Sequence, residues 1–377
     1  RLPAYRHWRG DTDTAFRRML PARRIYRGLD APGGDVVLHT VSVCDLDRAA
    51  MACESTAVLG GSGRVFHVAE DALYVWTNAA RATRDAAPAA LFRLPLDGGA
   101  PSMLQASGSP VDQMGFLQKD GWLNVLVARD GHGERMWRST RAGRGLALLR
   151  VPLSAFGGLD ARARPSQYRD LPGTSGWNLH QRFVSDWLVY GDDAAGRQQV
   201  HALRYASNAP AQTLTLPHSL ERIDALGDDA VLVGGDAGDL VFTGLRLRGA
   251  RASLADAYRR EQARQGDDRT HGFFYLPTAA DAGLLGLPIL HGDGASVLFL
   301  RNRGLALSPL GTLDSRRDEV DDGCRASCVD WYGNARPIFI GDRVFALMGY
   351  ELVEGRVDGD AIHERRRVDF GRSLRRD

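Results

Sequence analysis

The sequence has 377 residues, enough for one large domain or two ordinary ones, and a formal net charge of only +2. Lys119 is the only lysine among 48 basic residues. We interpret this excess of arginine as a compositional bias and expect no nucleic-acid partner. No apolar run approaches the roughly 18–20 residues of a transmembrane helix, so the sequence predicts no membrane-spanning segment.

The charge is concentrated at the two ends of the chain. Residues 1–29 carry a net charge of +6 and residues 363–377 carry +3, which leaves −7 on the intervening residues. Such basic ends could make peripheral contact with an anionic membrane or an acidic partner, although solvated, partly mobile ends are the simpler alternative. The sequence begins with Arg1 and shows no signal peptide, so we expect any export signal to lie upstream.

In chain order, residues 1–35 are rich in arginine and proline, show no clear period and are predicted to form a basic N-terminal extension. From residue 36 the sequence becomes dense in β-branched residues, beginning with VVLHTVSV at 36–43. A pattern then recurs about six times, in which a β-rich run is followed by a tight turn and a second β-rich run. Its turns fall near residues 71, 120, 186, 228, 283 and 342.

This recurring pattern predicts a modular all-β fold, which we interpret as a six- or seven-bladed β-propeller. The propeller is expected to occupy residues 36–370 as a single domain, followed by a basic tail at 371–377. One segment departs from the β pattern. Ser253-Leu-Ala-Asp256 has the spacing of a capping box, which predicts a short helical insertion at 253–265.

The four cysteines form two close pairs, Cys44 with Cys53 and Cys324 with Cys328. Two local disulfides would fit this spacing and would indicate an oxidising compartment. A four-thiolate zinc site is an alternative, but the eight residues between the first two cysteines exceed the usual ligand spacing. Free thiols are the third alternative. If disulfides form, their role is to stiffen loop tips.

Three stretches give the chain a resemblance to a known family. They are VFHVAEDALYV at 65–75, HGFFYLP at 271–277 with GLLGLP at 283–288, and FIGDRVFAL at 339–347. In these stretches the chain resembles secreted bacterial and archaeal proteins with a C-terminal β-propeller domain, distantly similar to tryptophan–aspartate repeat propellers. The resemblance implies export and carries no catalytic residues onto this sequence.

The familiar catalytic motifs are absent from the sequence. It contains no Gly-x-Ser-x-Gly elbow, no His-Glu-x-x-His zinc motif and no phosphate-binding glycine loop ending in Lys-Ser or Lys-Thr. We therefore name no catalytic residue and no cofactor. His132 and His291 lie in loop-like sequence and are candidate ligands, although a lone loop histidine is usually just solvated.

The segment at 318–332 combines acids, a cysteine pair and aromatic residues. Its carboxylates are a candidate calcium site, although acidic residues also favour turns for backbone reasons. With its disulfide, the loop would form a stiff rim for a cationic or peptide partner. The structural alternative is aromatic packing with solvated acids. The acidic candidates are Asp318, Glu319, Asp321 and Asp322, and the partner-binding candidates are Asp321, Asp322, Trp331 and Tyr332 together with His132 and His291.

Together these patterns predict a non-catalytic binding or scaffold module, exported to the periplasm or cell envelope, with a protein or glycan partner. The alternative is a hydrolase or lyase that acts on polysaccharide or peptide at the mouth of a propeller channel. Facing carboxylates or a histidine at that mouth would favour the enzyme.

Overall fold

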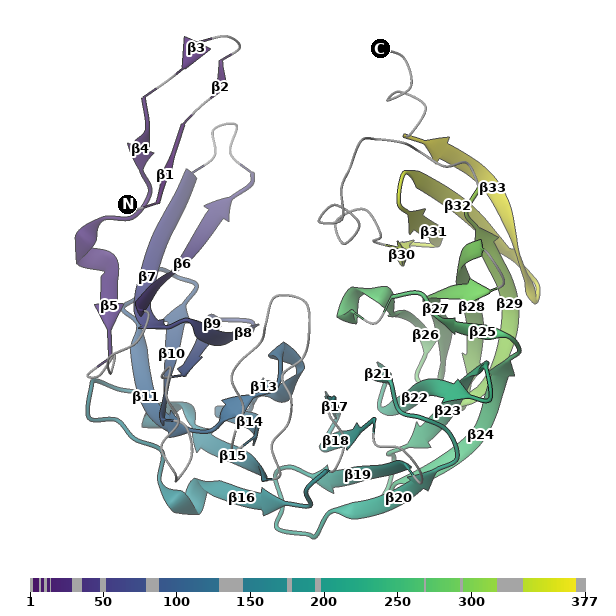
Figure 1. The fold of residues 1–377 in the computed structure, drawn as a ribbon, viewed down its shortest axis with the longest axis horizontal. Helices are drawn as coiled ribbons and strands as arrows, with labels where there is room; N and C mark the ends of the chain where they lie inside the picture. Colours follow the sequence, from purple (N-terminus) through teal and green to yellow (C-terminus); the bar gives the residue numbers. More distant parts are fainter. Residues whose placement is uncertain are drawn as a thin grey trace. The chain divides into compact units, whose positions relative to one another are not determined.

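The structure is a computed structural model, and Figure 1 shows the course of the chain. The chain divides into two compact units, Arg1–Leu179 (unit 1) and His180–Asp377 (unit 2). The residues described are 3–6, 8–9, 12–13, 15–28, 36–47, 52–78, 88–128, 145–174, 178–193, 198–267, 269–291, 294–316 and 335–370.

The described part of unit 1 contains three sheets and two short ribbons. The ribbons pair β1 (Ala4–Tyr5) with β4 (Arg17–Arg18) and β2 (Trp8–Arg9) with β3 (Thr12–Asp13). The first sheet has the order β5 (Ile25–Arg27), β7 (Ala52–Gly61), β6 (Val36–Asp45), and the second has β11 (Ser102–Ser107), β10 (Pro88–Pro95), β9 (Ala72–Asn78), β8 (Gly63–Val68). The third has β12 (Ser109–Pro110), β14 (Trp122–Ala128), β15 (Leu146–Pro152), β16 (Tyr168–Leu171), with β13 (Phe116–Lys119) also on β14.

The described part of unit 2 contains four sheets that follow one another along the chain. They are β17 (Leu179–Val184), β18 (Trp187–Asp192), β19 (Gln198–Arg204), β20 (Gln212–Leu216); and β21 (Arg222–Leu226), β22 (Asp229–Asp236), β23 (Asp239–Arg246), β24 (Ser253–Arg260). Next come β25 (Ala263–Gln265), β27 (Ala282–His291), β28 (Gly294–Arg303), β29 (Ala306–Asp314), with β26 (Phe274–Ala279) on β27; and β30 (Ala335–Ile340), β31 (Arg343–Met348), β32 (Glu351–Asp358), β33 (Ala361–Asp369).

The predicted all-β fold of blade-like sheets is confirmed. From β8 onward, the described strands form six successive sheets of four or five strands, and paired neighbours within them run antiparallel. The only helical segments described are 3-10 turns: η1 (Ala22–Arg24), η2 (Gln113–Gly115), η3 (Leu153–Ala155), η4 (Pro165–Gln167) and η5 (Thr270–Gly272). The domain limits proposed near residues 35 and 370 stay predictions.

The helical insertion predicted at 253–265 is wrong, because this segment forms strands β24 and β25. β24 pairs with β23 in antiparallel register, with Phe242 opposite Tyr258 and a bulge between Thr243 and Leu245. The capping-box spacing is a local signal only. The outer edge of β23 offers a full row of backbone partners, and pairing with it prevails over local helix preference.

Strand position explains which residues are buried. The central strands β9, β18 and β22 are almost wholly buried; β22, for example, contributes Leu232 to one apolar layer and Val233 to another. The first strand β8 instead alternates between buried and more exposed residues. Adjacent sheets within each unit share apolar layers, with Trp76 and Phe116 in unit 1 and Trp187 and Leu232 in unit 2.

The predicted turns connect first and second strands, as the β13–β14 turn illustrates. Asp120 and Gly121 both have positive φ angles, 51° and 77°, between the paired residues Lys119 and Trp122. Two central residues with positive φ are typical of a type I′ hairpin, which matches the twist of the strands it connects. The turn expected near residue 283 lies slightly earlier, at 280–281.

Candidate ligand-binding pocket

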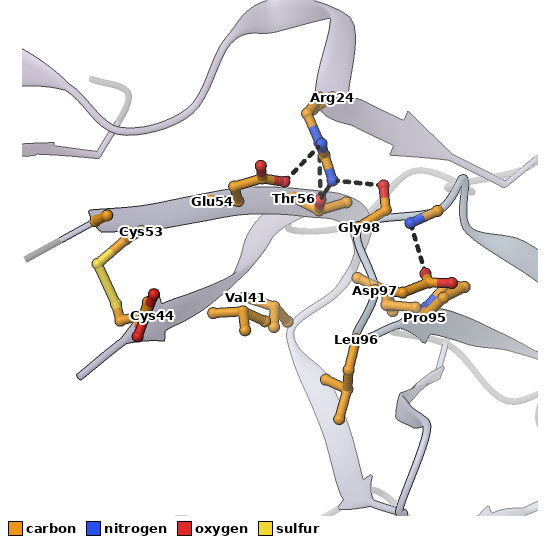
Figure 2. A pocket seen from close by; sticks show the side chains of 15 residues that line it. Arg24, Val41, Cys44, Cys53, Glu54, Thr56, Pro95, Leu96, Asp97 and Gly98 are labelled. Carbon is orange, nitrogen blue, oxygen red and sulfur yellow. Dashed lines mark hydrogen bonds and ion pairs between the residues drawn. A yellow bond between two sulfur atoms is a disulfide. The ribbon is translucent and has the colours of Figure 1, made fainter. Parts of the chain in front are cut away.

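Unit 1 contains an open pocket of about 360 Å³ beside the β6–β7 hairpin (Figure 2). The hairpin forms one wall, and the end of β10 with the turn at residues 96–99 forms the opposite wall. The side chain of Arg24, from η1, lies above the gap between the two walls. The pocket therefore combines three segments that are distant in the sequence.

The two-residue period of the strands decides which side chains face the pocket. In the antiparallel register of β6 and β7, Val41 lies opposite Thr56 and Val43 opposite Glu54. Residues in opposite positions share one face of a sheet. The pocket face of this hairpin therefore carries an apolar row on β6 and a polar row on β7.

Arg24 ties the walls of the pocket together. Its guanidinium donates two hydrogen bonds to the Thr56 hydroxyl, at 3.0 Å from Nε and 2.7 Å from Nη2. Nη2 also donates to the backbone oxygen of Gly98, at 3.2 Å, and Nη1 lies 3.4 Å from Oε2 of Glu54. Arg24 thus already has partners, and it holds the turn of the second sheet against the first.

Three carboxylates border the pocket and give it negative charge. Asp45, Glu54 and Asp97 line it together with Arg24, so the formal charge of the lining is −2. All three acidic residues are exposed, and the Glu54 side chain keeps 74% of its accessible surface. Asp97 accepts a hydrogen bond from the amide of Gly99, at 2.9 Å, which fixes the turn locally.

Aliphatic residues supply the rest of the lining. Leu94 is buried, Val41 and Leu96 are half-buried, and Val43 keeps 43% of its surface exposed. Such a surface is suited to the hydrocarbon part of an amphipathic group, while the carboxylates are suited to a positively charged end. The pocket can therefore hold a cation with an apolar stem.

The predicted disulfide between Cys44 and Cys53 is present, and it joins opposite residues of β6 and β7. It closes the hairpin near its tip, as expected for a bond that stiffens a loop. A zinc site that uses all four cysteines is therefore not formed. Cys324 and Cys328 lie outside the described residues.

A second acidic turn lies directly behind the pocket wall. The amide of Leu96 donates to the backbone oxygen of Asp71, at 2.9 Å. The Asp71 carboxylate accepts hydrogen bonds from Gln118, at 2.8 Å, and from Arg93, at 2.7 Å. The bond from Gln118, supported by the charge of Arg93, lowers the pKa of Asp71 below its ordinary value. The Asp71 carboxylate therefore stays ionised, and the turn that carries it helps to hold the pocket wall in place.

Most of the residues predicted as a site lie outside the described part of the chain. The exception is His291, which is exposed and lies at the end of β27, opposite Gly294, and not in a loop. Within the described residues, no group of three histidine, cysteine or acidic side chains is arranged to hold a metal. The predicted site residues that lie outside the described part are His132, Asp318, Glu319, Asp321, Asp322, Trp331 and Tyr332.

The sequence alone did not identify Arg24, Glu54 or Asp97 as members of one site. Asp97 was visible only as part of the Asp-Gly-Gly turn that ends a strand, and Arg24 as one of many arginines in the basic extension. The nearby cysteine pair was the one available signal, because it marked a stiffened hairpin.

Unit 2 contains a separate buried polar cluster around Arg222. Its guanidinium donates to Asp224 at 3.2 Å, to Gln265 at 2.7 Å and to the backbone oxygen of Asp267 at 2.8 Å. Arg182 of β17 also forms an ion pair with Asp224. The cluster joins β17 and β21 to the segment after β25, so we assign it a structural role.

No protein-family model and no curated protein matches the sequence. Among solved structures, the chain is similar to a putative 6-phosphogluconolactonase from Bacteroides uniformis, with 9% identity, coverage of 89% of this chain and 97% of that one, and a TM-score of 0.44. It is similar to Kluyveromyces lactis Hsv2, with 8% identity, coverage of 82% and 100%, and a TM-score of 0.40. It is also similar to Pseudomonas brassicacearum lignostilbene dioxygenase, with 12% identity, coverage of 62% and 60%, and a TM-score of 0.36. Similarities at this level carry nothing about activity.

Proposed function

We propose that the protein is a non-catalytic binding module for a basic protein partner, and that the pocket beside the β6–β7 hairpin receives a lysine or arginine side chain. The observation that carries the proposal is the pairing of an acidic rim with an aliphatic floor. The residues that line the pocket include three carboxylates and one guanidinium, and the Glu54 side chain stays largely exposed beside its Arg24 contact. An added cation would reduce the formal charge of the lining from −2 to −1.

The shape and chemistry of the pocket favour a peptide over a glycan. A side chain such as arginine places its aliphatic stem on apolar surface and its charge near carboxylates, and both elements are present here. The described lining residues include no aromatic ring on which a sugar could stack. The partner class therefore narrows to a protein or peptide with exposed cations.

We further propose that the protein works outside the cytoplasm, in the periplasm or cell envelope. The disulfide supports this location, because such bonds persist mainly in oxidising compartments. The described residues contain no helix with the length and hydrophobicity of a membrane span. Alkylation of the protein taken from its native cells tests the location, since free thiols at Cys44 and Cys53 would contradict export.

Binding of basic peptides to pocket variants tests the function. Glu54→Gln and Asp97→Asn each remove one charge from the rim, and Glu70→Gln removes a charge from an exposed residue outside the lining. A fluorescent peptide rich in arginine should bind up to about fivefold more weakly to each rim variant, since an exposed ion pair contributes up to about 1 kcal/mol. It should bind Glu70→Gln as it binds the unaltered protein.

Two outcomes would contradict this function. One is equal binding of the arginine peptide and of a copy with glutamine in place of every arginine. The other is equal weakening by the rim variants and by Glu70→Gln, because the effect would then reflect net charge and not the pocket.

A further inference from the structure

In the part of the chain that the structure describes, the sheet that carries the pocket ends in an open edge. It contains three strands, whereas every sheet from β8 onward contains four or five in the described residues. β6 forms its edge, and among the residues that the structure describes it pairs only with β7. A sheet edge of this kind offers a row of backbone donors and acceptors to another strand.

The register shows which backbone groups of β6 face outward. The Cα atoms of Cys44 and Cys53 are 4.1 Å apart, the short separation of a non-hydrogen-bonded antiparallel pair. The amide and carbonyl of Cys44 therefore point away from β7. The pairing has no bulge, so the same orientation recurs at every second residue, at Ser42, Thr40 and Leu38.

Within the described residues, β6 lacks several of the features that protect a sheet edge against strand addition. Natural edges are blunted by short strands, lysine, proline or bulges. β6 has ten residues, no lysine or proline, and an unbroken register with β7. It also exposes Val36 and Val43, at 50% and 43% of their accessible surface. The strand is therefore well suited to accept a partner.

From these observations we infer that the partner binds as an extended segment that adds a strand to β6. This inference rests on the proposed function, since it describes how a basic partner reaches the pocket. An added strand places every second side chain on the face of Val43 and Asp45, which is the pocket face. The recognised segment therefore carries cations at alternate positions, complementary to the acidic rim of the pocket.

Backbone methylation of a peptide tests strand addition directly. The probe is a six-residue peptide of alternating valine and arginine, together with two copies N-methylated on one or the other set of alternate amides. Only one set can bond to β6, so one copy should bind at least about tenfold more weakly and the other about as well as the parent. Equal affinity of the two copies would overturn the inference.

Hydrogen exchange and a proline variant provide independent readouts. The outward amides of Leu38, Thr40 and Ser42 should exchange rapidly in the free protein and slowly with the peptide bound. Protection of these amides in the free protein would show that the edge is already occupied and would overturn the inference. Ser42→Pro removes one outward amide without breaking a backbone hydrogen bond to β7, but it also removes the contact of the Ser42 hydroxyl with Ser55, at 2.8 Å. Ser42→Ala loses the same hydroxyl and keeps the amide, so it is the control. In protein that is folded by circular dichroism, Ser42→Pro should weaken binding about tenfold relative to Ser42→Ala.

The proposed function and this inference can fail separately. If methylation and Ser42→Pro have no effect but Glu54→Gln weakens binding, the pocket binds a cation without strand addition. If methylation weakens binding but a peptide of alternating valine and glutamine binds equally well, the edge accepts a strand and the charge-based function is wrong.

Discussion

His218 lies in the interior of unit 2, with 4% of its surface exposed. Its Nδ1 lies 2.6 Å from the backbone oxygen of Ser219, and its Nε2 lies 2.8 Å from the hydroxyl of Thr243. Nδ1 must donate to the carbonyl, which leaves Nε2 to accept from the hydroxyl in the neutral ring. Burial lowers the pKa of His218 below its ordinary value of 6.5, although the carbonyl contact opposes this shift.

A lowered histidine pKa predicts that stability falls in mild acid. Above pH 6.5 the histidine is neutral in both states, and its contribution is fully present. Below pH 6.5 the unfolded chain binds a proton that the folded protein resists, so the free energy of unfolding decreases by up to about 1.4 kcal/mol per pH unit. Burial also lowers the pKa values of His39 and His201, which adds to the effect.

Urea denaturation between pH 5 and pH 8 measures this dependence. His218→Gln should give a shallower fall of the unfolding free energy with decreasing pH, whatever its effect on absolute stability. An unchanged slope in His218→Gln would show that this ring does not resist protonation.

At the scale of elements, Gly234 allows the segment that leads into β21 to lie alongside β22 at very close range. A Cβ atom at this position would overlap the backbone oxygen of Ser219. Two backbone hydrogen bonds hold this close approach. The amide of Ser219 donates to the oxygen of Gly235, at 3.0 Å, and the amide of Glu221 donates to the oxygen of Val233, at 2.9 Å. The glycine is therefore required by contact with backbone, which cannot move aside as a flexible side chain can.

Two glycine-to-alanine variants distinguish the stability cost of a close contact from the cost of an unfavourable backbone conformation. Gly234→Ala should lower the free energy of unfolding by about 2–3 kcal/mol or more, because the segment at Ser219 must move away from β22 to make room for the added methyl group. Gly121 has a φ of 77°, and a Cβ atom added there would have no neighbour within 4 Å, so Gly121→Ala should cost only about 1–2 kcal/mol of strain. Equal losses in denaturant titrations would contradict this ranking.

The elements differ in how far the sequence could predict them. The turn at Asp120 and Gly121 was predictable, because a short-range pattern of β-rich runs and turn residues decides it. The strand at 253–260 was not, because its state depends on β23, which is close in sequence but pairs through a bulge. Local spacing near Ser253 favoured a helix, and only the pairing partner reverses that preference.

At the scale of the whole molecule, the pocket was beyond prediction for a related reason. Arg24 meets Glu54 across 30 positions of sequence and Gly98 across 74. Sequence periodicity reports which residues share a face of one strand, but not which sheets lie next to each other. The β-rich run at 36–43 therefore predicted a strand, whereas the acidic rim appeared only once the turn at 96–99 was placed beside it.

Removal of the disulfide tests whether a loss of stability in unit 1 leaves unit 2 unchanged. Replacing Cys44 and Cys53 with serine removes a bond that spans nine positions, and chain entropy then predicts a loss of about 2–3 kcal/mol in unit 1. Hydrogen exchange should accelerate in β6 and β7. It should stay unchanged in β22 and β23, which belong to unit 2 and have apolar layers of their own.

The location of the faster hydrogen exchange shows what the Cys44–Cys53 disulfide stabilises. Faster exchange confined to the hairpin, with weaker binding of the arginine peptide, would show that the bond holds the pocket wall in its binding shape. Faster exchange throughout both units would contradict this, because the disulfide would then stabilise the fold as a whole. Retained peptide affinity with a mobile hairpin would instead place the binding energy on the opposite wall, where the turn at 96–99 carries Asp97.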